Sequence, residues 1–171
     1  MPASLDLTAA FRATMGRLAT GVSVITTRNE SDPIGMTASA VASLSMDPLQ
    51  LIVCIGNHLY TCEAITNSGR FAVNILGEGS EELAMNFAVS KPDKFAGVDF
   101  HVEHGVPVLR DAIAYVVCDV AAALPGGDHT IFVGDARHFE HREQARPLLY
   151  FAGGFRSMRR APSAAVPVRT S

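Results

Sequence analysis

The sequence predicts a mainly β fold, in which an antiparallel sheet is closed or curled into a barrel and helices plug its ends. Three observations support this fold class. Runs rich in β-branched residues outnumber helical patterns, and most of these runs follow one another through turn sequences. Two long β-rich runs near the carboxyl end flank residues 125–128, Pro-Gly-Gly-Asp, which is the composition of a hairpin connection.

The first half of the chain predicts one helix and four strands. Apolar residues recur at helical spacing after the expected N-cap Thr8, and the pattern stops before Gly21. The apolar residues of this stripe are Phe11, Met15 and Leu18. Strands are then expected over residues 22–27, 33–39, 42–45 and 49–55, and the first two resemble a hairpin.

The second half predicts two short helices among further strands. Residues 60–67 have a helical composition that ends at Gly69, and Leu83 and Phe87 are four residues apart within a second helix at 80–88. The strands are expected at 71–76, 100–103, 115–124, 130–141 and 148–151. We find no internal repeat and expect one domain over residues 1–160, with a disordered tail at 161–171 because that segment is small, proline-interrupted and without aromatic residues.

Composition argues against several classes of partner. The net charge is −3 and lysines and arginines form no long block, so nucleic acid is not an expected partner. The longest apolar runs fall short of the roughly 20 residues that a membrane-spanning helix needs. The cysteines, Cys54, Cys62 and Cys118, fit neither a disulfide framework nor a zinc site, and the amino terminus lacks a secretory profile. These features predict a cytoplasmic protein with reduced cysteines and no membrane contact.

Two segments carry residues suited to ligand binding. His129 opens an apolar strand just after a two-glycine turn, so its imidazole can project toward a ligand while Ile131 and Val133 anchor the strand; a histidine that only caps its own turn is the alternative. Residues 35–40 combine small side chains with hydroxyls, which lets a ligand approach the backbone, although a polar edge strand has the same composition. No glycine-rich dinucleotide fingerprint or phosphate-loop lysine is present.

Five segments together resemble one family. They are GMTAS at 35–39, SLSMDP at 43–48, SGRFAVNIL at 68–76, GDHTIFVG at 127–134 and LYFAGGFR at 149–156. Their order is that of the short-chain flavin reductases, the reductase components of two-component flavin-dependent monooxygenases, and the resemblance covers residues from about 7 to 160.

This resemblance implies an antiparallel, FMN-binding split β-barrel that forms a homodimer with the flavin near the subunit interface. It also implies NAD(P)H:flavin oxidoreductase activity, in which NADH, or alternatively NADPH, reduces FAD or FMN. The reduced flavin would then diffuse to a partner monooxygenase. Such a reaction needs little acid–base chemistry from side chains, because the cofactors carry the redox chemistry and the protein positions them.

The resemblance also implies two sets of site residues. The flavin set is Thr37, Ala38, Ser39, Ser45, Cys54, Ile55, Gly56 and Asn57, with Thr61 and Lys91 near the phosphate and Phe95 beside the ring. The set that receives the nicotinamide dinucleotide is His129, Tyr150, Gly153, Phe155 and Arg156. His129 is the expected catalytic-site residue, with a role in binding the dinucleotide. No metal is expected.

The chain departs from the family pattern at residues 56–61, which read GNHLYT where relatives commonly carry serines and a basic residue for flavin phosphate. Phosphate recognition is therefore expected from Asn57, Thr61 and Lys91, and the preference between FAD and FMN stays open; a solvated lysine is the alternative for Lys91. Two other functions are considered. A pyridoxamine phosphate oxidase would need more basic residues around its phosphate, and a non-enzymatic flavin or haem carrier would need its six scattered histidines to converge.

Overall fold

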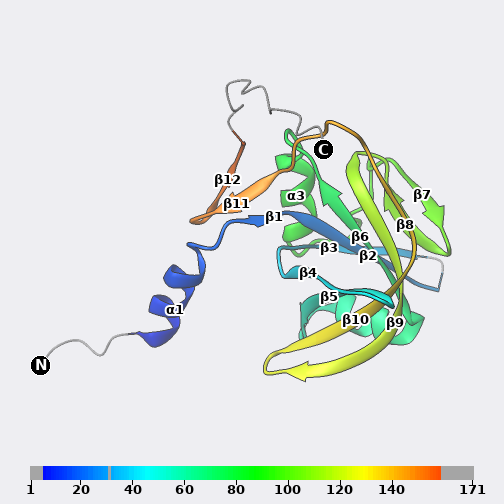
Figure 1. Ribbon diagram of the computed structural model, residues 1–171, viewed down its shortest axis with the longest axis horizontal. Helices are drawn as coiled ribbons and strands as arrows, with labels where there is room; N and C mark the ends of the chain where they lie inside the picture. Colours follow the sequence, from blue (N-terminus) through cyan, green and yellow to red (C-terminus); the bar gives the residue numbers. More distant parts are fainter. Residues whose placement is uncertain (1–5, 31, 159–171) are drawn as a thin grey trace, which may run out of the picture.

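The structure is a computed structural model that describes residues 6–30 and 32–158. A long antiparallel sheet curls around a core, and helix α1 stands apart from it at the left of the view (Figure 1). In chain order the elements are α1 Leu7–Met15, β1 Thr20–Gly21, β2 Ser23–Asn29, β3 Asp32–Ala38, β4 Val41–Met46, β5 Leu49–Gly56, α2 Tyr60–Ser68, β6 Arg70–Leu76, α3 Glu81–Ala88, β7 Phe100–Glu103, β8 Val106–Leu109, β9 Ala112–Gly126, β10 His129–His141, β11 Leu149–Phe151 and β12 Gly154–Arg156.

The large sheet has seven strands in the order β3-β2-β6-β9-β10-β5-β4, and every neighbouring pair is antiparallel. Its two edge strands, β3 and β4, are consecutive in the chain and are separated only by residues 39–40. The sheet therefore curls until its edges nearly meet, and within residues 6–30 and 32–158 no strand ladder joins them. The predicted fold class, mainly antiparallel β, is confirmed.

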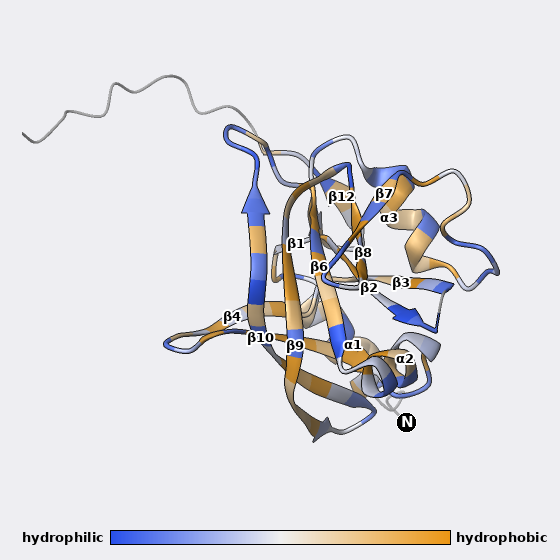
Figure 2. Cartoon of the chain, turned by 90° about the vertical axis from the view of Figure 1, so that its right-hand side faces the viewer, coloured by the Kyte–Doolittle hydropathy of each residue, from blue (hydrophilic) through white to orange (hydrophobic). Residues whose placement is uncertain are grey.

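The core lies inside this curl, where apolar side chains of several strands meet. Phe71 on β6 and Phe132 on β10 are fully buried and belong to the same cluster as Ile25, Val53 and Ile55. Gly134 makes this packing possible, since a Cβ there would lie 2.6 Å from Cζ of Phe71. Figure 2 shows hydrophobic residues along much of β9, whose first half contributes Ala112, Val117 and Cys118 to the core while its end near the turn is exposed.

The predicted hairpin between the two long strands is confirmed. β9 and β10 pair antiparallel from Gly126 and His129 at the turn to Ala114 and His141 at the far end. Gly127 takes a left-handed φ of 72° in this turn, which glycine adopts without steric penalty. Register shifts at Val133/Gly134 and Ala136/His138 mark two β-bulges, which increase the local twist and help the sheet to curl.

Two small sheets and two helices complete the fold. β1, β11 and β12 form a three-stranded sheet, and β7 and β8 form a separate hairpin. Helix α2 packs against β2, β3, β5 and β6, while α3 packs against β3 and β2. The helix predicted at 60–67 is confirmed, and it ends at Gly69, whose φ is 66°.

Helix α1 differs from the prediction in two respects. Its N-cap is Asp6, whose carboxylate accepts hydrogen bonds from the N–H groups of Thr8 and Ala9, so Thr8 lies inside the helix. Its apolar stripe packs against nothing in the described chain: Leu7 is 79% exposed and Phe11 68% exposed. The tail expected at 161–171 lies outside the described residues. No helix within residues 6–30 and 32–158 is both long and apolar enough to cross a membrane.

Candidate active site

A cavity of about 700 Å³ opens between β3, the amino end of α2, the carboxyl end of α3 and the segment that follows α3. Sites for small molecules and cofactors in proteins commonly have volumes of this size. Four of the residues predicted to bind flavin line it together, namely Thr37, Thr61, Lys91 and Phe95.

The floor of the cavity is apolar and rigid. Phe87 and Phe95 pack edge to face with ring centroids 5.0 Å apart, and Phe95 continues to Phe100 at 5.2 Å. Gly35 lies directly against this stack, because a Cβ at that position would meet Cε1 of Phe87 at 2.7 Å. The absence of a side chain at Gly35 therefore lets β3 pack directly onto the Phe87 ring.

One side of the cavity is cationic. The ammonium of Lys94 donates hydrogen bonds to the carbonyl oxygens of Phe87, at 3.0 Å, and Gly35, at 3.3 Å, while Lys91 lies nearby on the same lining. Burial, and then the positive charge of Lys91, lower the pKa of Lys94. The amino end of α2, which no side chain caps, adds the positive end of a helix dipole at Tyr60 and Thr61. This side of the cavity is suited to an anionic group.

A second group of predicted residues gathers where β5 ends and β10 begins. Gly56 pairs with His129, and the side chain of Thr130 donates to Oδ1 of Asn57 at 2.8 Å. The Asn57 N–H donates to the carbonyl of Asp128 at 2.9 Å, so the turn and the end of β5 are tied together. Cys54 and Ile55 precede Gly56 on the same strand.

His129 is held by its neighbour. Its Nδ1 lies 2.7 Å from Oδ1 of Asp128, and this hydrogen bond lowers the pKa of the Asp128 carboxyl. The His129 side chain is 45% exposed, so the imidazole keeps a free edge toward solvent or a ligand.

The other residues predicted to bind the dinucleotide lie elsewhere in the structure. Tyr150 on β11 pairs with Phe155 on β12, and their rings meet edge to face with centroids 5.7 Å apart. Gly153 forms the turn between these strands with a φ of 79°, and Arg156 follows on β12. Figure 1 shows this small sheet and the β9–β10 turn well apart, so one chain does not bring His129 to these residues.

Three other predicted residues are placed as follows. Ala38 is buried at the end of β3, and Ser39 is exposed in the two-residue connection to β4. The carbonyl of Ala40, the next residue, accepts a hydrogen bond from the Cys54 N–H at 3.0 Å. Ser45 pairs with Gln50 at the opposite end of β5 from Gly56, and its hydroxyl accepts from the Asp47 N–H at 3.2 Å.

Sequence reasoning missed several residues of the cavity. Lys94 is the most important, because it is the more buried of the two lysines on the lining. Asn29 and Tyr60 also line it and are joined by a hydrogen bond from the Asn29 amide to the Tyr60 hydroxyl. Thr37 was predicted, but its hydroxyl already donates to the Ala84 carbonyl at 2.6 Å. The pair of lysines within one short segment was the only signal in the sequence.

Comparison with known proteins identifies the family. The chain is 35% identical over 148 residues to the reductase subunit HsaB of a flavin-dependent monooxygenase from Mycobacterium tuberculosis, covering 85% of this chain and 79% of that protein. It is 40% identical over 147 residues to the reductase component of a 4-nitrophenol 4-monooxygenase/4-nitrocatechol 2-monooxygenase from Rhodococcus opacus, covering 86% and 79%.

A solved structure of another flavin oxidoreductase is also similar to this chain. The Streptomyces globisporus NADH:FAD oxidoreductase SgcE6, in complex with NAD and FAD fragments, superimposes with a TM-score of 0.85 at 33% identity, covering 92% of this chain and 94% of that one. Residues 15–159 match the model of the flavin reductase like domain. The chain therefore belongs to the flavin reductase-like family.

Proposed function

We propose that this protein is an NADH-dependent flavin reductase that supplies reduced flavin to a separate monooxygenase. The single observation that carries this function is the cavity, which combines an aromatic floor at Phe87 and Phe95 with two lysines and a helix amino end. The relatives support it, since they are named as reductase components of two-component monooxygenases and as an NADH-dependent flavin reductase.

The residues present fit a flavin. A planar ring would lie in the cavity beside β3, and Thr61, Lys91 and Lys94 would hold its phosphate. When bound, the flavin supplies the redox chemistry, because its ring accepts the hydride that the nicotinamide releases. The contribution of the protein is to hold two rings in contact and exclude water from between them, and orientation of this kind contributes at most about 7–11 kcal/mol to catalysis.

His129 would bind the nicotinamide dinucleotide. Its pairing with Asp128 orients the imidazole, and its position beside Gly56 places it next to the strand end that leads into the cavity. No proton transfer is required of His129, because a hydride moves between the two bound molecules.

A second copy of the chain would complete the site. The nucleotide residues Tyr150 and Phe155 lie on a different sheet from His129, and Tyr150 is 40% exposed. The apolar stripe of α1 is also exposed, with Phe11 at 68% and Met15 at 47%. A homodimer that covers these surfaces would unite residues that a single chain keeps apart, and it would bury apolar area that otherwise contacts water.

An assay that crosses two flavins with two nicotinamides tests the proposal. Purified protein should oxidise NADH only when FAD or FMN is added, and sedimentation should give twice the mass of one chain. Absence of flavin-dependent NADH oxidation would refute the reductase function. A non-enzymatic carrier is not favoured by the names of the relatives, and a Soret band in the purified protein would be its signature.

A further inference from the structure

The fold brings together two histidines and two glutamates on the face of the molecule where the β7–β8 hairpin meets β9 and β10. Among the described residues, ligand atoms of Glu103, His104 and His138 all lie within 4.8 Å of one another. Glu140 joins them, since its Oε1 lies 3.5 Å from Nε2 of His138. None of these residues lines the flavin cavity.

The spacing of these atoms suits a tetrahedral metal site. Zinc binds histidine nitrogen and carboxylate oxygen at about 2.0–2.2 Å, which sets neighbouring ligand atoms about 3.3–3.5 Å apart in a tetrahedron. Nε2 of His104 lies 3.4 Å from Oε1 of Glu103, and the corresponding His138–Glu140 distance is 3.5 Å. Two of the ligand pairs already have the separation that a bound ion requires.

Irregular backbone aims the two imidazoles at each other. His104 has a φ of 46°, an uncommon conformation for a residue other than glycine, in the tight turn between β7 and β8. The turn is fixed by Arg70, which donates to the His104 carbonyl at 2.7 Å. His138 follows a β-bulge in β10, a feature that re-aims side chains. The two rings lie with centroids 5.4 Å apart.

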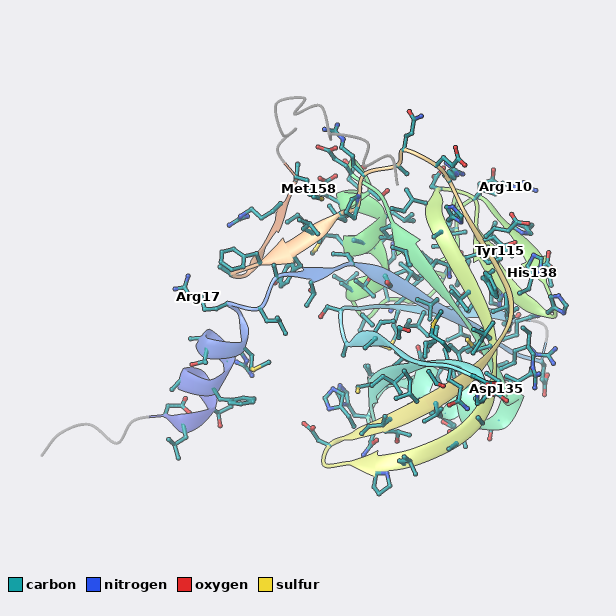
Figure 3. The ribbon with its side chains drawn as sticks, in the orientation of Figure 1. Arg17, Arg110, Tyr115, Asp135, His138 and Met158 are labelled. Carbon is teal, nitrogen blue, oxygen red and sulfur yellow. The ribbon has the colours of Figure 1, made fainter. Side chains whose placement is uncertain are left out.

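A second layer of contacts supports the cluster. Tyr115 stands opposite Glu140 on β9, hydrogen bonds to its carboxylate, and lies against His138 with ring centroids 5.8 Å apart; Figure 3 shows Tyr115 and His138 side by side. Hydrogen bonds to ligating carboxylates are typical of metal sites in proteins.

Two arginines, on β6 and β10, are paired with a carboxylate outside the cluster. Arg70 and Arg137 both bind the carboxylate of Asp119, at 2.6 Å and 2.7 Å. Arg137 also lies 3.6 Å from Asp135.

We propose that Glu103, His104, His138 and Glu140 form a binding site for a divalent transition-metal ion of the Zn²⁺ class, which clips the β7–β8 hairpin to β10. Imidazole together with carboxylate selects zinc and its neighbours over Mg²⁺ and Ca²⁺, which prefer sites built of oxygen alone. The site is separate from the flavin cavity, and its role is structural. Its existence does not depend on the reductase activity.

The test uses tag-free full-length protein that has been treated with a chelator and dialysed. Titration with Zn²⁺, followed by calorimetry, should show one saturable site per chain and a rise in Tm, whereas Mg²⁺ should give neither. Co²⁺ should give the visible absorption of a tetrahedral nitrogen and oxygen site.

Four variants separate this site from general surface binding. His138→Ala and His104→Asn should abolish the saturable site, and asparagine is chosen because it tolerates the left-handed conformation at residue 104. Tyr115→Phe, which removes a positioning hydroxyl, should weaken Zn²⁺ binding about 10–100-fold. His141→Ala is the matched control on the same strand and should bind as wild type does, because His141 is not part of the cluster.

All four variants should retain flavin-dependent NADH oxidation, and their circular dichroism should match that of the wild type. The proposal is overturned if wild-type protein shows no saturable Zn²⁺ binding, or if His138→Ala binds Zn²⁺ with unchanged affinity and the same rise in Tm.

Discussion

Replacing Lys94 with methionine should weaken binding of flavins that carry a phosphate and leave riboflavin, which has none, unaffected. Lys94 is the partly buried cation of the cavity, and its ammonium already donates to the carbonyl oxygens of Gly35 and Phe87. An ammonium has three donors, so one remains for a ligand. The substitution removes that donor and the charge while it keeps an unbranched apolar side chain of similar length.

The expected magnitude follows from this one remaining bond. A hydrogen bond to a charged group contributes about 1.5–3 kcal/mol, and partial exposure of Lys94 favours the lower end of that range. At about 1.4 kcal/mol for each factor of ten, KM for FMN should rise roughly tenfold. Lys91 is exposed, and Lys91→Met should raise KM for FMN only about two- to threefold.

The assay measures initial rates of NADH oxidation against FMN and against riboflavin at a fixed saturating concentration of NADH. Lys94→Arg is the matched control, since it keeps the positive charge and should restore much of the affinity for FMN. Because the pKa of Lys94 is lowered, the wild-type KM for FMN should rise with pH below the ordinary lysine value of 10.5, and this rise should be missing in Lys94→Met. Equal losses of affinity for FMN and riboflavin would refute a phosphate contact.

Three further substitutions probe the site and one salt bridge of the fold. His129→Ala should raise KM for NADH several-fold and leave KM for flavin within about twofold, because the imidazole is expected to touch only the dinucleotide, and steady-state kinetics checks this. Gly35→Ala should lower the free energy of unfolding by about 1–3 kcal/mol in urea titrations and raise KM for flavin, since the new Cβ would lie 2.7 Å from a fully buried phenylalanine ring. The control is Gly21→Ala, because a Cβ at Gly21 would have nothing within 4 Å. Asp119→Asn should lose less stability than the wild type on acidification. The Arg70 hydrogen bond lowers the pKa of the Asp119 carboxyl, so the stabilising charge is lost as pH falls from the ordinary value of 3.8 through the lowered pKa.

Each of these predictions has a contradicting result. Equal changes in the two KM values would assign His129 to the wrong ligand. A Gly35→Ala protein as stable as Gly21→Ala would mean that β3 does not press on the aromatic floor. Equal losses of stability in the wild type and in Asp119→Asn as pH falls below 3.8 would show that Asp119 gains nothing from its arginine partners.

The positions of most strands along the chain could be predicted because their signals are local. β2, β5 and β6 lie within two residues of the runs predicted from β-branched residues, and α2 ends at the glycine that was expected to stop it. β8 was not predicted, because its four residues include Pro107, which lowers strand propensity; all four are buried only because β7 and the large sheet cover them.

The site was predictable only in part, for a related reason. The strand segment that ends at Gly56 and the turn before His129 carry recognisable motifs, and antiparallel pairing brings them together. Which lysine of residues 91–94 turns into the cavity depends on where α3 ends against β3, and no local pattern reports that contact. The same limit applies to His104 and His138, which are 34 residues apart in the sequence and meet only after the β7–β8 hairpin folds onto the sheet.

Helix α1 is amphipathic, and the homodimer proposed above would cover its exposed apolar stripe. The stripe of Phe11 and Met15 has helical spacing, and a helix of nine residues gains little stability in water without burying such a face. The strand that follows α1 pairs with β11, which carries Tyr150, so whatever covers α1 also lies near the second half of the nucleotide site. In the proposed homodimer a second copy would meet both needs, because the surface that covers α1 would also lie near one chain's Tyr150. On this proposal the exposed stripe and the divided nucleotide residues have one explanation.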